Sequence, residues 1–329
     1  MSAPATHLSR PLVGIAFKLG SAFSFSCMGA CVKMASSVSG PTHFPVGEIV
    51  FARSFFALIP LFVWLAATGA LSSAFVTENR MGHIRRGIVG SLGMGFGFAG
   101  LAYLPLPDAT AISFAAPLFS TVLAALVLGE VVRLFRWSAV LVGFVGVIVM
   151  LWPHLSAEAL MTDGGTERAR GAAFGLAGAL AAAFALIEVR KLTWSETTGA
   201  IVLHFSLLTT VLGVLSLLGG AIAPDYAWVK PDGKQALFLL LTGISGGFGQ
   251  IFLTEAYRRA PASLVAPFDY TAMIFAILWG YMLFGDWPEP LVLLGAGIVA
   301  ASGIAVIWRE RALNINRGKD ASAGPSRSL

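Results

Sequence analysis

Runs of mostly apolar residues, separated by short polar segments, dominate the pattern of the chain. There are ten of them, at 12–35, 45–67, 85–104, 107–129, 134–152, 171–190, 198–223, 235–257, 261–284 and 290–308. A helix needs about 20 apolar residues to cross the hydrocarbon core of a bilayer, so each run is long enough for one crossing. The pattern predicts an all-α integral membrane protein with ten transmembrane helices.

Two stretches of this pattern repeat each other. Ala102–Ser120 reads AYLPLPDATAISFAAPLFS, and Ala256–Ile274 reads AYRRAPASLVAPFDYTAMI. Both begin with Ala-Tyr and carry proline at the sixth position and phenylalanine at the thirteenth. They belong to the fourth and ninth runs, and an offset of five crossings turns the second copy upside down. The repeat therefore predicts two inverted five-helix halves, an architecture of secondary transporters with the solute site between the halves.

Other matches divide the chain in the same way. The first run opens with GIAFKL at 14–19 and the sixth with GAAFGL at 171–176. Gly-Glu at 129–130 after the fourth run matches Gly-Asp at 285–286 after the ninth. We expect an N-terminal tail at 1–11, a first repeat at 12–152, a linker at 153–170, a second repeat at 171–308 and a C-terminal tail at 309–329.

Charge is scarce and unevenly placed. Only 12% of the residues are charged, about half the share of a soluble domain. If the N-terminus is cytoplasmic, fifteen of the 22 lysines and arginines fall at cytoplasmic ends and four in outer loops. Cytoplasmic loops accumulate positive charge. This bias predicts that both termini lie in the cytoplasm, and it explains why the second copy of the repeated stretch carries Arg258 and Arg259. We expect a multi-pass protein of the bacterial inner membrane.

These features resemble the EamA-type branch of the drug/metabolite transporter superfamily. The resemblance rests on LVLGE at Leu126–Glu130, LFGDWP at Leu283–Pro288, Arg53 in the second run, and GAGIVAASGIAVI at Gly295–Ile307. It implies a ten-helix bundle around a central cavity that opens alternately to the two sides of the membrane. It also implies a small organic solute; members of the superfamily carry amino acids, nucleotide-type metabolites, S-adenosylmethionine or vitamins such as riboflavin.

The leading expectation for the solute is an aromatic or heteroaromatic metabolite such as riboflavin, taken up into the cell. Export of an amino acid or another metabolite is the alternative within the superfamily. Two other classes are a non-transporting membrane scaffold and a membrane-embedded enzyme. An enzyme would need a convergent nucleophile, acid–base or metal set, and the sequence shows none, so we predict that the protein is not an enzyme.

Ionisable residues inside the apolar runs are the first candidates for a site, because each costs about 2.5–3.5 kcal/mol at the centre of a bilayer. Arg53 either holds a substrate carboxylate or phosphate or forms an internal ion pair with Glu48 or another acid. Asp269 and Tyr270 follow Pro267, which removes a backbone hydrogen bond and kinks a helix. They form either a substrate or proton site or a purely structural kink. Pro117 predicts a similar kink in the fourth run.

Further polar side chains lie on helical faces. Gln250 shares one face with Thr254 and Tyr257, which favours a cavity-lining position. His204 is either a packing histidine or part of a proton relay, because histidine titrates near neutral pH. Glu188 is either a local salt-bridge partner of Arg190 or, with Asp269, a further member of such a relay.

The aromatic side chains Phe114 and Phe268, with Tyr270, can stack on a planar solute or simply pack between helices. Gly95–Gly100 reads G-x-G-x-x-G, but no strand precedes it, so it is not a dinucleotide motif. Glycines at 90, 93, 97 and 100 share one helix face and predict close helix packing instead. No ATP-binding motif and no metal-ligand spacing is present, and no basic stripe suggests nucleic acid. We expect a small organic solute and the lipid bilayer as partners, and no cofactor or metal.

Overall fold

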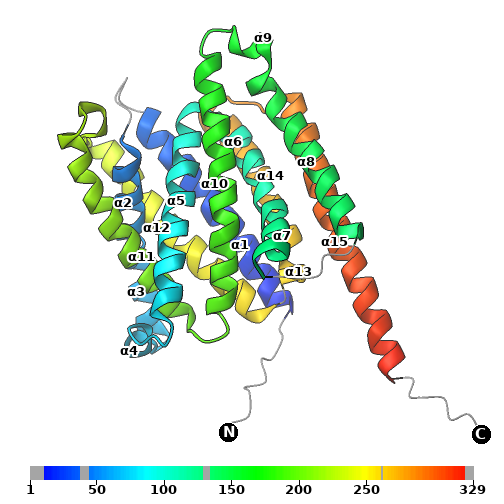
Figure 1. Cartoon of the computed structure of the whole chain (residues 1–329). Coiled ribbons are helices and arrows are strands. Elements are labelled where there is room, and N and C mark those ends of the chain that lie inside the picture. The colour runs from blue at the N-terminus through cyan, green and yellow to red at the C-terminus, as the bar shows by residue number, and fades with distance from the viewer. Residues whose placement is uncertain (1–10, 38–43, 129–133, 261, 323–329) are drawn as a thin grey trace, which may run out of the picture.

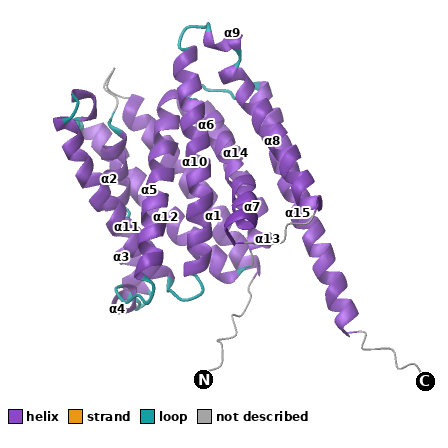
Figure 2. Ribbon diagram, in the orientation of Figure 1, coloured by secondary structure: helices purple, strands orange, loops and turns teal. Residues whose placement is uncertain are grey.

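The computed structural model describes residues 11–37, 44–128, 134–260 and 262–322. All regular structure in these ranges is helical (Figure 2). The first half contains α1 (Pro11–Ser37), α2 (Val46–Phe56), α3 (Leu58–Ala67), α4 (Leu71–Ala74), α5 (Arg80–Tyr103), α6 (Leu106–Ser113), α7 (Ala115–Leu128), α8 (Leu134–Leu155) and α9 (Ala157–Leu160). The second half contains α10 (Gly165–Leu192), α11 (Thr198–Leu215), the short helices η1 (Ser216–Ala221) and η2 (Pro224–Tyr226), α12 (Gly233–Arg259), α13 (Ala262–Val265), η3 (Ala266–Tyr270), α14 (Thr271–Trp279), η4 (Gly280–Phe284) and α15 (Pro290–Ser322).

Eight of the described segments are long and apolar enough to cross a membrane. They are Leu12–Ser36, Val46–Ala67, Leu106–Leu123, Leu134–Leu160, Gly165–Leu192, Thr198–Ala221, Gly233–Arg259 and Ala266–Phe284. The apolar part of α15, Pro290–Val306, is shorter, and the glycine-rich α5 is not among the eight. The chain is thus a multi-pass membrane protein, while the number ten stays a prediction.

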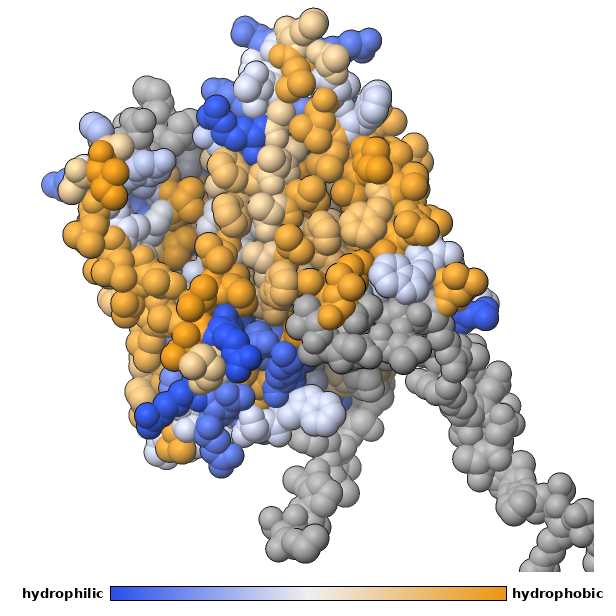
Figure 3. Space-filling view, viewed as in Figure 1, coloured by the Kyte–Doolittle hydropathy of each residue, from blue (hydrophilic) through white to orange (hydrophobic). Residues whose placement is uncertain are grey.

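The surface has the layered polarity of a membrane protein. Hydrophobic residues form a broad band across the face seen in Figure 3, and hydrophilic residues gather at its two ends. On α8 the side chains of Leu141, Val145, Ile148 and Trp152 are all exposed. They recur at the spacing of one helix face, which presents an apolar stripe to the bilayer.

The two halves run in opposite directions. In Figure 1, α1 rises from the lower end of the bundle, whereas α10, which begins the second half, descends from the upper end. The most extensive contacts of α1 are with α12, and those of α10 are with α5. Each half therefore packs its first long helix against the third crossing of the other half, as an inverted repeat requires.

Glycine permits the closest of these contacts. A Cβ built on Gly178 of α10 would lie 3.0 Å from the backbone nitrogen of Gly97 on α5. A Cβ on Gly100 would lie 3.0 Å from the nitrogen of Gly175. Side chains at these positions would push the two backbones apart, so the glycine face of α5 serves helix packing, as in small-xxx-small interfaces.

Two of the ten predicted crossings, the fourth and the ninth, are broken at related positions. The fourth divides into α6 and α7 at Phe114. Pro117 lies three residues further on, and a proline ring clashes with the carbonyl of the residue four positions earlier in a regular α-helix, which here is Ser113. The ninth divides at η3, a 3-10 segment that contains Pro267. The breaks meet in the interior, where the rings of Phe114 and Tyr270 pack edge to face with centroids 5.1 Å apart. Glu130, which the repeat pairs with Asp286, lies outside the described residues.

Candidate functional site

An ion pair between a buried lysine and a partly exposed aspartate lies where η3 meets α1. Lys18 Nζ lies 2.7 Å from Asp269 Oδ1 and donates a hydrogen bond to the Tyr257 hydroxyl oxygen at 3.2 Å. The side chain of Lys18 is only 2% exposed, whereas that of Asp269 is 36% exposed. Because η3 is a tight 3-10 turn between two α-helical segments, it places Asp269 at the point where the helix is interrupted. The carboxylate can thus meet both Lys18 and a solute.

Tyr257 on α12 joins this pair to a second cation. Lys18 Nζ lies 4.7 Å from the centroid of the Tyr257 ring, and the guanidinium carbon of Arg190 lies 5.7 Å from the same centroid. Three elements of the second half, α10, α12 and η3, therefore converge with α1 of the first half on one polar centre. Two cations and one carboxylate give this centre an excess of positive charge.

The aromatic candidates separate into two environments. Phe114 is buried, and Tyr270 is partly buried against it. Tyr270 also approaches α15, because a Cβ on Gly303 would collide with its hydroxyl group. Phe268 is partly buried and its carbonyl accepts a hydrogen bond from Thr271 Oγ1 at 2.6 Å. Phe114 and Tyr270 come together from the two halves, and Phe268 lies one residue from Asp269.

Arg53 does not pair with Glu48. Its Nη2 donates to the carbonyl of Gly246 at 3.3 Å, while Glu48 Oε2 accepts from the backbone N–H of Val229 at 2.9 Å. Gln250, one turn beyond Gly246 on α12, is buried, and its Nε2 has no hydrogen-bond partner within the described part of the chain. Arg53 and Gln250 thus face the interior with unused donors.

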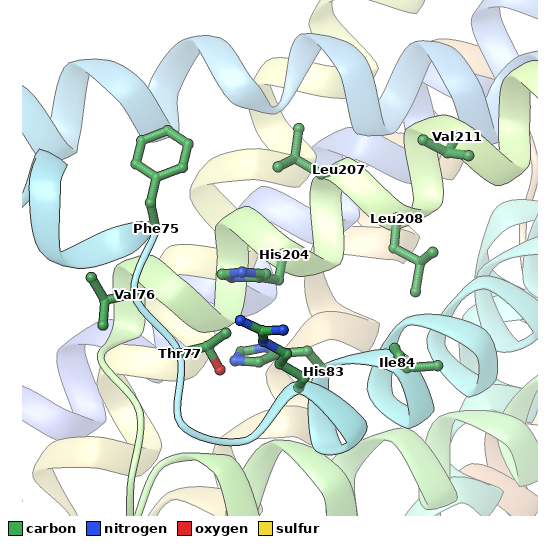
Figure 4. A pocket seen from close by; sticks show the side chains of 10 residues that line it. Phe75, Val76, Thr77, His83, Ile84, His204, Leu207, Leu208 and Val211 are labelled. Atoms are coloured by element: carbon green, nitrogen blue, oxygen red, sulfur yellow. The ribbon is translucent and has the colours of Figure 1, made fainter.

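The two remaining candidates lie away from Asp269. His204 stacks on His83 with ring centroids 4.4 Å apart, in a groove of about 620 Å³ between α5, α11 and the segment that precedes α5 (Figure 4). Glu188 Oε1 pairs with Lys191 Nζ at 3.0 Å. Among the residues that the structure describes, no hydrogen bond or ion pair joins His204 or Glu188 to Asp269. The three do not form one continuous relay in this conformation.

Glu196, in the turn between α10 and α11, anchors the start of α5. Its Oε1 accepts hydrogen bonds from Thr77 Oγ1 at 2.8 Å and from the backbone N–H groups of Glu78 and Asn79 at 2.9 Å each. Burial alone would raise the pKa of this carboxyl, but these bonds and the nearby His83 outweigh burial and lower the pKa. The carboxylate therefore stays charged and holds two helix ends together.

A second ion pair closes the opposite end of the bundle. Lys33 Nζ lies 2.7 Å from Asp286 Oδ2 and donates to the carbonyl of Leu104 at 3.3 Å. Lys33 and Lys18 are fifteen residues apart on α1, or about 22 Å along its axis. Both pairs connect α1 to the ninth crossing or to the segment that follows it. Neither pair was proposed as a site from the sequence, although each lysine interrupts an apolar run.

Apolar crossings in two inverted copies, with a charged centre at a broken helix between the copies, define the class of this protein as a membrane transporter. The model of the EamA-like transporter family matches it twice, at residues 12–152 and 169–309. The chain belongs to that family, as its sequence features suggested. Both the family and the named relatives are transporters rather than enzymes.

The relatives carry different solutes. The chain is 28% identical to an S-adenosylmethionine uptake transporter of Rickettsia prowazekii over 80% of this chain and 83% of that protein. It is 28% identical to the pseudopaline exporter of Pseudomonas aeruginosa over 89% of this chain and 95% of that protein. It is also 28% identical to a riboflavin transporter of Vibrio cholerae, over 89% and 92% respectively. A solved crystal structure shares the fold, with a TM-score of 0.60 and 18% identity over 89% of this chain and 98% of that one.

Proposed function

We propose that this protein is a secondary transporter that moves a small heteroaromatic metabolite across the bacterial inner membrane by alternating access. The observation that carries the proposal is the Lys18–Asp269 pair, a buried charge pair between the halves at a broken helix. Broken helices of this kind hold solutes in other transporters with inverted repeats. The charge bias of the sequence supports an orientation with both termini in the cytoplasm.

The pair suits a solute that carries charges of both signs. A carboxylate of the solute can replace Asp269 beside Lys18, and a cationic group can replace Lys18 beside Asp269. The Lys18–Asp269 pair would then be replaced by two pairs, each between one of these residues and the solute. Every buried charge keeps a partner, which lowers the free-energy cost of moving charge through the membrane. Tyr257 stays in reach of Lys18 throughout, and Gln250 on the same helix offers a free amide donor.

S-Adenosylmethionine is the first solute candidate, because it combines a heteroaromatic base with an amino-acid group whose carboxylate and ammonium match Lys18 and Asp269. A relative bears its name. Riboflavin is the second candidate, favoured by the edge-to-face pair of Phe114 and Tyr270, which with Phe268 can contact a planar ring. An exporter of an amino-acid-type metabolite is the third, consistent with the pseudopaline exporter among the relatives.

Proton coupling would centre on Asp269, because loss of its charge would release Lys18 and protonation is the simplest way to remove that charge. His204 and Glu188 would take part only after a rearrangement that brings them toward Asp269. Inward transport is the direction proposed, although the same exchange operates in both directions under the appropriate gradients.

Solute counterflow in proteoliposomes tests the proposal, because it requires neither a known direction nor a known coupling ion. Labelled S-adenosylmethionine, riboflavin and an aromatic amino acid are each offered against a matching internal pool. We expect accumulation of S-adenosylmethionine by the wild type and its loss in Asp269→Asn and in Gln250→Ala. Asp163→Asn, which makes the same chemical change on an exposed loop, is the matched control and is expected to transport normally.

The outcomes separate the parts of the proposal. Normal transport by both Asp269→Asn and Gln250→Ala, with normal membrane insertion, would overturn the site. Accumulation of riboflavin alone would replace the solute. An absence of counterflow by the wild type with every solute on the panel would withdraw all three solute candidates.

A further inference from the structure

Two buried arginines, neither of them part of the Lys18–Asp269 pair, approach the same aromatic ring. The guanidinium carbon of Arg86 on α5 lies 3.8 Å from the centroid of Phe205, and that of Arg53 on α2 lies 5.4 Å from the same centroid. Arg53 is 2% exposed and Arg86 is 5% exposed. Phe205 belongs to α11, so three helices converge on this point.

Neither guanidinium group has a counter-charge in the described part of the chain. Nε and Nη1 of both arginines are buried without a hydrogen-bond partner. The single hydrogen bond of the pair runs from Arg53 to the carbonyl of Gly246. Contact with an aromatic face is worth about 0.5–2 kcal/mol, which is less than the several kcal/mol that burial of each charge costs. Two like charges that share one ring also repel each other.

The surrounding helices leave room for these groups. A Cβ on Gly90 would collide with Arg86 Nη1 and come within 2.7 Å of the Phe205 ring. A Cβ on Gly246 would lie 3.0 Å from Arg53 Nε. Glycine on α5 and on α12 thus makes space for the two side chains. Unused donors of Gln250 and Ser206, on the two helices that supply Gly246 and Phe205, are buried as well.

The groove of Figure 4 is lined by residues that neighbour Arg86 and Phe205 along their helices. His83 and Ile84 of α5 and His204 and Leu208 of α11 line it. Arg86 follows Ile84 by two residues, and Phe205 follows His204 directly. His83 precedes Arg86 by three residues and shares its face of α5.

We propose that Arg53 and Arg86 together bind one oxyanion, a carboxylate or phosphate group of a small solute, between α2, α5, α11 and α12. Two guanidinium groups match the oxygen pairs of such a group through charge-assisted hydrogen bonds. The oxyanion would supply the counter-charge that the described residues do not provide. Its assignment to the transported solute rests on the proposed function, whereas anion binding itself does not.

Anion-dependent thermal stability of the purified protein in detergent tests the site. Acetate and inorganic phosphate are compared with chloride at matched ionic strength, for the wild type, Arg53→Gln, Arg86→Gln and the control Arg85→Gln. Arg85 is the exposed neighbour of Arg86, so the control removes the same charge from the surface. We expect acetate or phosphate to raise the midpoint temperature of the wild type and Arg85→Gln. We expect Arg53→Gln and Arg86→Gln each to need at least about ten times more anion than the wild type for the same rise in midpoint temperature.

A purely structural role predicts the opposite behaviour. If the arginines only hold helices together, Arg86→Gln unfolds at a lower temperature than the wild type in chloride and keeps the same shift with phosphate. Under the proposal, Arg86→Gln in chloride is as stable as the wild type or more stable, because an uncompensated charge is removed. Equal anion shifts in all four proteins would overturn the site. Stabilisation by added phosphatidylglycerol, without any effect of acetate or phosphate, would also overturn it by assigning the arginines to a lipid headgroup.

Counterflow then tests the assignment to the solute. S-Adenosylmethionine carries a single carboxylate, so this group would meet the arginines and Lys18 in turn, and Arg53→Gln and Arg86→Gln are expected to lose most of its transport. Any counterflow of riboflavin, which carries neither oxyanion, is expected to match that of Arg85→Gln. Normal S-adenosylmethionine transport by both variants would overturn that assignment. If the wild type transports nothing on the panel, the proposed function fails while the anion-dependent shift still stands.

Discussion

Lys18 and the two arginines solve the same physical problem in different ways. Lys18 is buried beside a carboxylate of the chain and a tyrosine hydroxyl. Arg53 and Arg86 are buried as deeply, yet they face an aromatic ring, one carbonyl and each other. Within the described ranges the chain supplies a counter-charge only to the first cation, and we propose that an outside partner supplies it to the other two.

This difference shows what a buried charge reveals about a transporter. A paired charge can be exchanged: a solute may enter only as the internal partner leaves, so the empty site stays compensated. An unpaired charge is vacant: a solute can bind without displacing anything, but the empty site carries the full cost of burial. The paired charge of Lys18 therefore favours release of a solute as much as its binding, whereas the unpaired arginines favour binding.

The largest expected loss of stability comes from removing one partner of the Lys18–Asp269 pair. Asp269→Asn leaves Lys18 charged and buried, which costs about 3–5 kcal/mol when one partner of a buried pair is removed. Lys18→Met leaves Asp269, whose side chain is 36% exposed and can be hydrated, so we expect it to cost less than half as much. Chemical denaturation in detergent measures both free energies of unfolding. A greater loss of unfolding free energy in Lys18→Met than in Asp269→Asn would contradict the view that Lys18 needs its partner more than Asp269 does.

A loss of stability of intermediate size is expected at Glu196, a carboxylate that, within the described part of the chain, is held by hydrogen bonds and not by an ion pair with lysine or arginine. Glu196→Gln should destabilise the protein at neutral pH by about 1.5–3 kcal/mol, the range for hydrogen bonds to a charged group. Because the folded state lowers the pKa of Glu196 from 4.5, its contribution is complete above pH 4.5 and is lost as the pH falls through the folded-state pKa. The difference in stability between wild type and variant should therefore shrink on acidification. Glu158→Gln, on the exposed helix α9, should show no such convergence.

The smallest expected loss of stability is at the Lys33–Asp286 pair, which tests whether burial accounts for the difference between the two ion pairs. Lys33 and Asp286 are 20% and 28% exposed, so Asp286→Asn should cost no more than about 1 kcal/mol. The same denaturation experiment, with Asp163→Asn as the control, measures it. A loss as large as that of Asp269→Asn would show that burial does not distinguish the two ion pairs.

The parts of the structure that depend on local pattern could be predicted from the sequence. The apolar runs and the duplicated stretches at Ala102 and Ala256 led to a helical membrane protein with two related halves. Pro117 and Pro267 indicated where crossings four and nine are interrupted, because proline acts on its own helix. Membership of a transporter family was also evident, and the family match confirms it.

The partners of buried charges could not be predicted in this way. Lys18 meets Asp269 only because α1 packs between segments of the other half, a contact that no local pattern reveals. The suggested pair of Arg53 with Glu48 had a geometric weakness, since residues five apart in a helix do not share a face. For the same reason, nothing in the sequence connected Arg53 to Arg86 or to Phe205, which lie on three different helices.

The packing of α1 against α12 also bears on how the chain is made. α1 leaves the ribosome well before α12 and Asp269, which follow Lys18 by more than 200 residues. Throughout that interval Lys18 has neither its carboxylate nor its tyrosine hydroxyl. The nascent first helix must therefore wait at the insertion machinery, tilt so that Lys18 reaches water, or carry a neutral amine until its partners arrive. In a protein whose halves interlock so fully, the last third of the chain completes the folding of the first.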